Sequence, residues 1–455
     1  MKRARLFLYL ALVVALSPCF VLAQSPVDGA AIDSYVKPYF ETANFSGSVL
    51  VEKDGKIVFE KSYGLADREK KLANRGSTRF HIASISMQYT AAAILRLIDQ
   101  KRIGLETRVS EVVPGITGGD RISIRDLLVQ QSGLADINEL SDYREILKAH
   151  QTPESLVAKI KDRPLLFEPG SKYQHEEHSA YNLLALIIEK KTGLSFSKAM
   201  KKLVFDPAGL GKTSIDDDGG TGSDVANGYQ TKGLSGLEPS ATMHWSAKSG
   251  NASVITTARD QARWVRAAFE GQFLSKTSQG LLLNTSPAVG YGWFRRDSPR
   301  FHETAYYMNG RSPGFASFVL YLAKERLTVV VFSNIYSSAT TTIGNDIGAI
   351  SIGLPFEPFQ PSTVALSAEQ LNSSTGSFKF GPDFYQANAE VHLVANGSEL
   401  SLRWPSGDVS PLIPVGGDHF VDRAYWEPVI IERDANGKPT QLSYDRFKGP
   451  YIRAN

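Results

Sequence analysis

Segment 355–361, Pro-Phe-Glu-Pro-Phe-Gln-Pro, divides this chain into two stretches of different character. Proline fixes φ and has no backbone N–H, so closely spaced prolines interrupt both helices and central strands. The stretch before this segment mixes helical and strand patterns, whereas the stretch after it alternates apolar and polar residues. A chain of 455 residues is also long for one hydrophobic core. We therefore predict two folded parts, 24–354 and 362–455, joined by a linker at 355–361.

The first residues have the features of a secretory signal peptide. Basic residues precede the apolar run 6–16, and a small residue, Ala23, ends the segment. The run is short for a membrane span, so we predict a signal peptide at 1–23 and no membrane insertion after its removal. The mature protein is then exported, either to the periplasm or to the medium. A lipoprotein acylated at Cys19 is an alternative that Pro18 disfavours.

Charge and cysteine content narrow the classes of partner and chemistry. Removal of 1–23 takes away three positive charges, so the formal net charge falls from +3 to 0. A neutral chain gives no reason to expect nucleic acid or an anionic membrane as a partner. Cys19 is the single cysteine, so the mature chain has no disulfide, no thiolate nucleophile and no thiolate metal ligand.

The part before the linker shows both helical and strand patterns. Apolar residues recur at helical spacing after Ser84, and β-branched and aromatic residues mark strand runs. The elements expected in order are a helix at the mature N-terminus, strands at 47–51 and 56–62 joined by a hairpin at 53–55, a helix from 84 to about 101, a helix at 181–191 ending at Gly193, and strands at 315–322 and 327–332.

The part after the linker has the pattern of a small all-β accessory domain. Alternating runs at 390–394 and 399–404 flank Asn396-Gly397, and Asn436-Gly437 marks another hairpin.

The stretch 80–91 contains a serine followed three residues later by a methionine, Ser84 and Met87. It resembles the Ser-x-x-Lys segment of a large family of serine hydrolases, in which the lysine amine takes the serine proton. Residues three apart on a helix share a face, which is why that spacing suits the chemistry. Ser84 is present in the nucleophile position, and Met87 occupies the lysine position.

Other landmarks follow in the order and spacing of the same family. They are 127–134 (Leu-Leu-Val-Gln-Gln-Ser-Gly-Leu), 167–170 (Phe-Glu-Pro-Gly), 257–260 (Thr-Ala-Arg-Asp), 290–293 (Gly-Tyr-Gly-Trp), 311–317 and 332–334. On these motifs, 30–350 resembles the serine β-lactamase/DD-peptidase-like family related to class C β-lactamases. The resemblance implies an α/β (α+β) domain with a central antiparallel sheet flanked by helices, and it implies a serine nucleophile at Ser84.

The motifs that complete such a site depart from the family pattern. The stretch where Tyr-x-Asn is expected reads Tyr173-Gln-His-Glu-Glu-His178, and either His175 or Glu176 stands in the tyrosine position. The Lys- or His-x-Gly motif reads Met308-Asn309-Gly310. Gln130 stands where the family often has histidine. Because a thioether is no base at neutral pH, hydrolysis by the family's usual mechanism is not expected.

Three hypotheses follow for the function. The first is a non-hydrolytic protein that binds a small-molecule or peptide-like ligand in the old active-site cleft, with no cofactor. The second is a serine hydrolase in which Ser84 is served by His175 or His178, oriented by Glu176 or Glu177. The third is a soft-metal site, suited to copper, built from Met87, His175, His178 and Met308. The simplest interpretation of 175–178 is a polar loop that precedes a helix.

Overall fold

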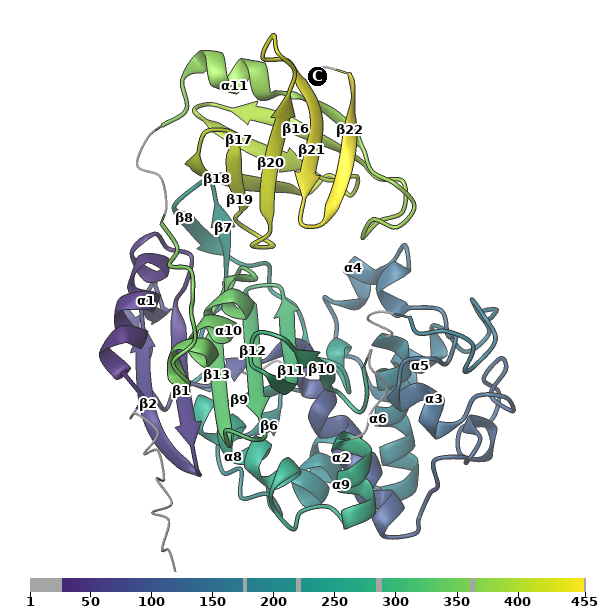
Figure 1. Ribbon diagram of the computed structural model, residues 1–455. Helices are drawn as coiled ribbons and strands as arrows, with labels where there is room; N and C mark the ends of the chain where they lie inside the picture. The colour runs from purple at the N-terminus through teal and green to yellow at the C-terminus, as the bar shows by residue number, and fades with distance from the viewer. Residues whose placement is uncertain (1–26, 175–177, 218–221, 284–288, 361–364, 454–455) are drawn as a thin grey trace, which may run out of the picture.

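The computed structural model describes residues 27–174, 178–217, 222–283, 289–360 and 365–453. They form a larger part, built around a six-stranded sheet, and a smaller β-barrel beside it (Figure 1). The predicted signal peptide 1–23, with Cys19, lies outside the described residues.

Six strands form the central sheet in the order β10-β11-β12-β13-β1-β2, and every neighbouring pair is antiparallel. Their bounds are β1 Gly47–Lys53, β2 Lys56–Tyr63, β10 Phe294–Ser298, β11 Glu303–Ser312, β12 Phe315–Leu322 and β13 Leu327–Ser333. The predicted hairpin between the first two strands is confirmed, and its turn residues Asp54 and Gly55 both have positive φ. The strands expected at 315–322 and 327–332 are confirmed as β12 and β13.

Strand β12 shows why helices cover both faces of this sheet. Neighbouring side chains on a strand point to opposite faces. Phe318 and Leu320 join the core beneath α1 and α10, whereas Val319 and Tyr321 join the core that includes α2 and α8. The bounds of these helices are α1 Gly29–Glu41, α2 Ser86–Asp99, α8 Ala258–Phe269 and α10 Ala339–Ser351.

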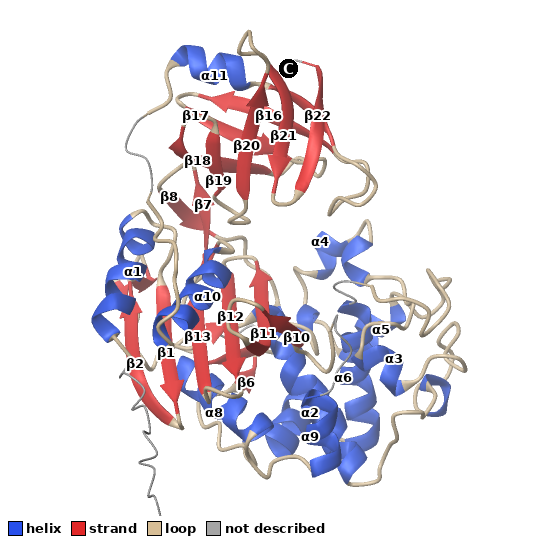
Figure 2. Cartoon of the chain, in the orientation of Figure 1, coloured by secondary structure: helices blue, strands red, loops and turns tan. Residues whose placement is uncertain are grey.

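Most of the other helices of the larger part lie beside the sheet, around α2 and α6 (Figure 2). The helix expected at 181–191 is confirmed as α6, His178–Thr192, and Gly193 follows it with a φ of 69°. The other helices are α3 Ile124–Leu128, α4 Tyr143–Ile146, α5 Pro153–Ala158, α7 Phe196–Met200 and α9 Lys276–Leu283. Short strands are β3 Leu65–Asp67, β4 Leu72–Ala73, β5 Phe80–His81, β6 Ser214–Ile215, β7 Tyr229–Lys232, β8 Gly236–Pro239, β9 Val254–Thr256 and β14 Ile335–Tyr336.

Eight strands after the linker form a closed barrel, in which each strand pairs with the next and β15 pairs with β22. Both Asn-Gly hairpins are confirmed, at the β16–β17 and β20–β21 turns. A short helix, α11 Ala368–Ser374, precedes the strands, and the alternating pattern gave no sign of it. The strands are β15 Gly376–Lys379, β16 Glu390–Asn396, β17 Glu399–Arg403, β18 Val409–Gly416, β19 His419–Asp422, β20 Pro428–Arg433, β21 Pro439–Tyr444 and β22 Phe447–Arg453.

Arg423 fastens the barrel to the larger part. Its side chain is fully buried, and burial lowers its pKa to about 10. The guanidinium donates to the Asn44 side chain at 2.8 Å and to the carbonyl oxygens of Ala43 and Gly236, both at 3.0 Å. The Ser337 hydroxyl in turn donates to the carbonyl oxygen of Arg423 at 2.9 Å. These bonds hold the barrel against the turn between α1 and β1, against β8 and against the residue that follows β14.

Candidate active site

Ser84 lies in a 3-10 turn, Ala83–Ile85, that leads directly into α2. The preceding residue, Ala83, has a φ of 49°, a conformation that residues with a side chain seldom adopt. Ser84 is half-buried, whereas Met87 one turn later is 1% exposed. The turn thus presents the serine hydroxyl at the edge of a helix whose other side chains form the core. The predicted start of the helix at 84 is two residues early, because the first turn is 3-10.

Strand β11 faces this turn at close range. A Cβ on Gly310 would collide with the carbonyl oxygen of Ile82 and would lie 2.9 Å from the backbone nitrogen of Ser84. The Ser317 hydroxyl, on the neighbouring strand β12, donates to the same Ile82 carbonyl at 2.7 Å. Glycine at 310 therefore allows the close approach of strand and serine backbone that a main-chain oxyanion hole requires.

Both methionines predicted at the site line one hollow with Ser84. The hollow has a volume of about 50 Å³, and its lining residues are Ser84, Met87, Gln130, Tyr173, Phe294, Met308, Asn309 and Arg311. Met308 lies on β11 opposite Val319 of β12 and is 4% exposed. The predicted convergence of Ser84, Met87 and Met308 is confirmed.

Gln130 covers the hollow from the side of α3. Its side chain is 3% exposed, and its Nε2 donates to the Sδ atom of Met87 at 3.9 Å. The residue has a φ of 57°, and its carbonyl oxygen accepts from the backbone N–H of Gln174 at 3.0 Å. Gln130 thus joins Met87 to the chain segment that carries Tyr173.

His178 does not line the hollow. It begins α6, where its backbone N–H donates to the Asp136 carboxylate at 2.8 Å and its ring Nδ1 lies 3.2 Å from the same oxygen. The Asn138 side chain lies 2.9 Å from this ring nitrogen. Burial tends to raise the pKa of Asp136, but the hydrogen bonds and charge of His178 hold it below its ordinary value. His175, Glu176 and Glu177 lie outside the described residues.

The structure brings together only some of the residues of the hypothetical copper site. Met87 and Met308 come together, whereas His178 is engaged by Asp136, and His175 lies outside the described residues. Across the described ranges, no group of three or more His, Cys, Asp and Glu side chains is placed to hold a metal ion.

Sequence reasoning missed four side chains that line the hollow: Tyr173, Phe294, Asn309 and Arg311. Two of these positions were within reach, since Asn309 and Arg311 flank Gly310 in the third motif. Tyr173 and Arg311 are the ionisable side chains that the described residues contribute to the lining. A phenol and a guanidinium are both poor proton acceptors at neutral pH, so neither side chain is a ready base for Ser84.

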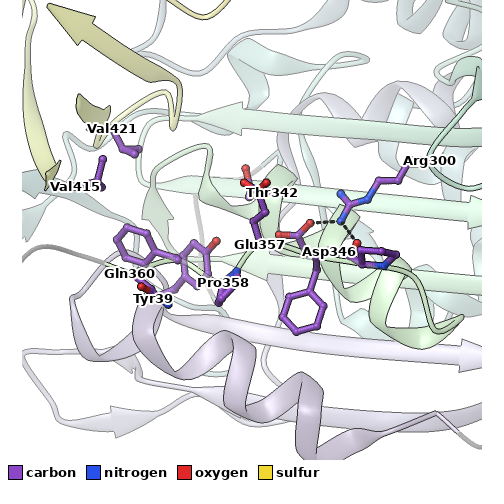
Figure 3. A pocket seen from close by; sticks show the side chains of 12 residues that line it. Tyr39, Arg300, Thr342, Asp346, Glu357, Pro358, Gln360, Val415 and Val421 are labelled. Carbon is purple, nitrogen blue, oxygen red and sulfur yellow. Dashed lines mark hydrogen bonds and ion pairs between the residues drawn. The ribbon is translucent and has the colours of Figure 1, made fainter. Parts of the chain in front are cut away.

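Another cavity, of about 750 Å³, is lined by residues of α1, α10, the segment 355–360 and the barrel (Figure 3). Two of its charged side chains, Arg300 and Asp346, pair with each other. Arg300 forms an ion pair with Asp346 and donates to the carbonyl oxygen of Pro355 at 3.3 Å, and the Tyr35 hydroxyl donates to Asp346 at 2.5 Å. The bond from Arg300 attaches the segment that begins at Pro355 to the wall of this cavity.

The antiparallel sheet covered on both faces, with a serine at the start of a buried helix facing β11, defines the β-lactamase and penicillin-binding protein class of fold. The sequence model of the family described as Beta-lactamase matches residues 32–350, and the chain belongs to that family.

The chain is also similar to individual proteins. It is 25% identical over 322 residues to Protein flp of Staphylococcus aureus (strain MRSA252), a match that covers 67% of this chain and 63% of that protein. It is 26% identical over 345 residues to the D-aminopeptidase of Gluconobacter oxydans (strain 621H), covering 72% of this chain and 63% of that protein. The matches thus span less than two thirds of the length of these relatives.

The similarity to solved structures extends over both parts of the chain. The octameric penicillin-binding protein homologue from Pyrococcus abyssi superposes with a TM-score of 0.64 at 20% identity. The match covers 93% of this chain and 99% of that one, so the barrel is included. At this identity the likeness shows a shared fold. No helix in the described part of the chain combines the length and the apolar character that a membrane span requires.

Proposed function

We propose that this protein binds a small-molecule or peptide-like ligand beside Ser84 and does not hydrolyse it efficiently. One observation carries the proposal: Met87 and Met308, which stand where the family resemblance places the site's basic residues, line the same hollow as Ser84. Both side chains are almost completely buried, at 1% and 4% exposure. The sulfur of Met87 accepts a hydrogen bond from Gln130 and has no proton-accepting role to offer Ser84.

The expected loss of activity is large. A serine hydroxyl attacks slowly unless a base removes its proton, and loss of a positioned base typically reduces the rate by about 10²- to 10⁴-fold. Catalytic groups act as a unit, so the residual oxyanion hole alone gives slow turnover. Binding, in contrast, needs only the fold and the shape of the site.

An active serine hydrolase with Ser84 as its nucleophile is the second candidate. The position of Tyr173 is the observation that favours it. The phenol of Tyr173 lines the hollow, whereas His178 is held by Asp136. A tyrosinate serves as a base only where its pKa is strongly lowered. A hydrolase that depends on Tyr173 or His175 would label at Ser84 with serine-directed reagents.

Intact-mass analysis after exposure to a penicillin and to a fluorophosphonate tests the proposal. We expect the mass of the mature protein to be unchanged after several hours at neutral pH with either reagent. The Ser84→Ala variant is the matched control. A stoichiometric mass increase that maps to Ser84 and disappears in Ser84→Ala would overturn the proposal and establish the hydrolase. Metal analysis of the protein as purified tests the copper alternative separately.

A further inference from the structure

A second cavity, of about 570 Å³, lies between the larger part and the barrel. Asn309 and Arg311 line both this cavity and the Ser84 hollow, so the two spaces meet at the end of β11. Ligand sites typically have volumes of about 300–1,000 Å³, a range that includes the cavity and excludes the hollow of about 50 Å³. The larger share of any ligand that reaches Ser84 would therefore lie in this inter-domain cavity.

Arg311 forms the wall between the two spaces. Its guanidinium carbon lies 3.9 Å from the ring centre of Tyr336 in β14 and 4.0 Å from that of Tyr425 in the barrel. The cation is thus held between two aromatic faces, one from each part of the chain. Together with the buried Arg423, this contact fixes the barrel relative to the β11 strand. These contacts fix the positions of the residues that line the cavity.

The barrel side of the cavity is aromatic. Tyr385, Trp404, Tyr425, Trp426 and Tyr444 line it, and Tyr385 and Tyr425 are 60% and 39% exposed. The Trp404 ring lies at 65° to Tyr425 and at 89° to Tyr444, with centres 5.4 Å and 5.2 Å apart. Rings at such angles form the corner of an aromatic cage, which attracts a cation through the negative ring faces.

Glu427 supplies a negative charge to the same cavity. No described residue forms a hydrogen bond or ion pair with its carboxylate, although it is partly buried and lines the cavity. Burial, with the nearby carboxylates of Asp445 and Asp422, raises the pKa of Glu427 to about 7, and Arg446 opposes this. Unpaired carboxylates in clefts mark binding sites, since a charge without a partner is costly to keep.

We propose that this inter-domain cavity binds an organic cation, an ammonium group on an apolar body. The ammonium lies against Glu427 and the aromatic rings of Trp404 and Tyr385. Carbonyl or carboxylate oxygens on the same molecule would lie toward Arg311 and Ser84. This ligand class rests on the proposed binding function beside Ser84. The cation site is argued only from the residues of the inter-domain cavity. No bond is made or broken in this step.

Tryptophan fluorescence reports on the site because Trp404 and Trp426 line it. The probes are 2-phenylethylamine, 2-phenylethanol and 3-phenylpropionate, which share a ring and differ in charge. At pH 8 we expect the amine to bind at least about tenfold more tightly than the alcohol, the factor that a cation over desolvated aromatic faces and a carboxylate supplies. The anion should bind more weakly than the amine.

Two variants locate the effect. Glu427→Gln should abolish the preference for the amine over the alcohol, whereas Glu369→Gln, an exposed carboxylate on α11 of the same barrel, should retain it. Circular dichroism confirms that both variants are folded. Equal binding of amine and alcohol, preference for the anion, absence of binding by all three probes, or an amine preference that persists in Glu427→Gln would each overturn the inference. Acylation of Ser84 is measured separately, so failure of the proposed function is distinguishable.

Discussion

The side-chain amide of Gln130 donates a hydrogen bond to the sulfur of Met87, across 3.9 Å of the hollow that contains Ser84. Sulfur is a weak acceptor, so this bond adds little energy, but it orients the amide and closes the hollow around apolar groups. Met308 packs from the facing strand. The hydroxyl of Ser84 therefore meets thioethers and an amide where a hydrolase of this fold needs a base.

Restoring the lysine alone should fail to restore activity. In Met87→Lys we expect turnover of a chromogenic cephalosporin to stay at the level of Ser84→Ala, because Met308 still faces the serine. We also expect a loss of stability of about 2–4 kcal/mol, since an ammonium without a partner would be buried where the methionine is 1% exposed. Urea unfolding and steady-state kinetics provide the measurements.

Met87→Leu is the matched control for this experiment. A volume-conserving apolar change in a packed site typically alters stability by less than about 1.5 kcal/mol. Robust hydrolysis by Met87→Lys at an unchanged melting temperature would show that the site retains a working second base, contrary to the proposed function.

Removal of the Arg423 guanidinium should uncouple the barrel from the larger part of the chain. In Arg423→Met, the carbonyl oxygens of Ala43 and Gly236 and the side chain of Asn44 lose their donor. Buried acceptors without partners are costly, and we expect a loss of about 3–5 kcal/mol together with a separate unfolding transition for the barrel. Arg403→Met, at an exposed barrel position, should change stability by less than about 0.5 kcal/mol. Calorimetry that shows one unshifted transition in Arg423→Met would contradict the assigned role.

The fold was predictable where local signals decide the structure. The aromatic and aliphatic run at 315–322 predicted a strand, and β12 is buried along its whole length. Asn396-Gly397 and Asn436-Gly437 mark hairpins that the barrel contains. Arg423 illustrates the limit, because its partner Asn44 lies 379 residues away in the chain. From the sequence alone, a charged residue in this position is expected to be exposed, because its contact with the larger part cannot be predicted.

The part of the site that follows from helical spacing was predictable, because Ser84 and Met87 are three residues apart and share a helix face. Ser84, Met87 and Met308 converge as the family motifs implied. The direction of His178 was not predictable, because it is set by Asp136, 42 residues earlier in the chain. Arg311 likewise turns toward the hollow and the barrel together, and no local pattern in the sequence indicates that the barrel supplies Tyr425 as its partner.

Glu427 should make the folded protein less stable as the pH rises. Its pKa is about 7 in the folded state against an ordinary 4.5, so between these values the folded state binds more protons than the unfolded state. The free energy of unfolding therefore falls from pH 4.5 to pH 7, by about 1–2 kcal/mol once partial solvent exposure is allowed for. The melting temperature of Glu427→Gln minus that of wild type should be more positive at pH 8 than at pH 5. The control Glu369→Gln should shift equally at both, and parallel curves for all three proteins would contradict the assignment.

Binding of the amine should change with pH in the opposite direction to stability. Glu427 attracts an ammonium only when ionised, and an alkylamine with a pKa near 10 stays protonated throughout the range. The affinity of 2-phenylethylamine should therefore rise about tenfold between pH 5.5 and pH 8.5. The midpoint of this rise should lie near the pKa of Glu427. Burial, Asp445 and Asp422 raise that pKa to about 7, and the charge of Arg446 opposes them. The alcohol should bind equally at both pH values, and Glu427→Gln should show a flat profile with the amine. An affinity of wild type that is constant with pH would mean that the ammonium lies away from Glu427.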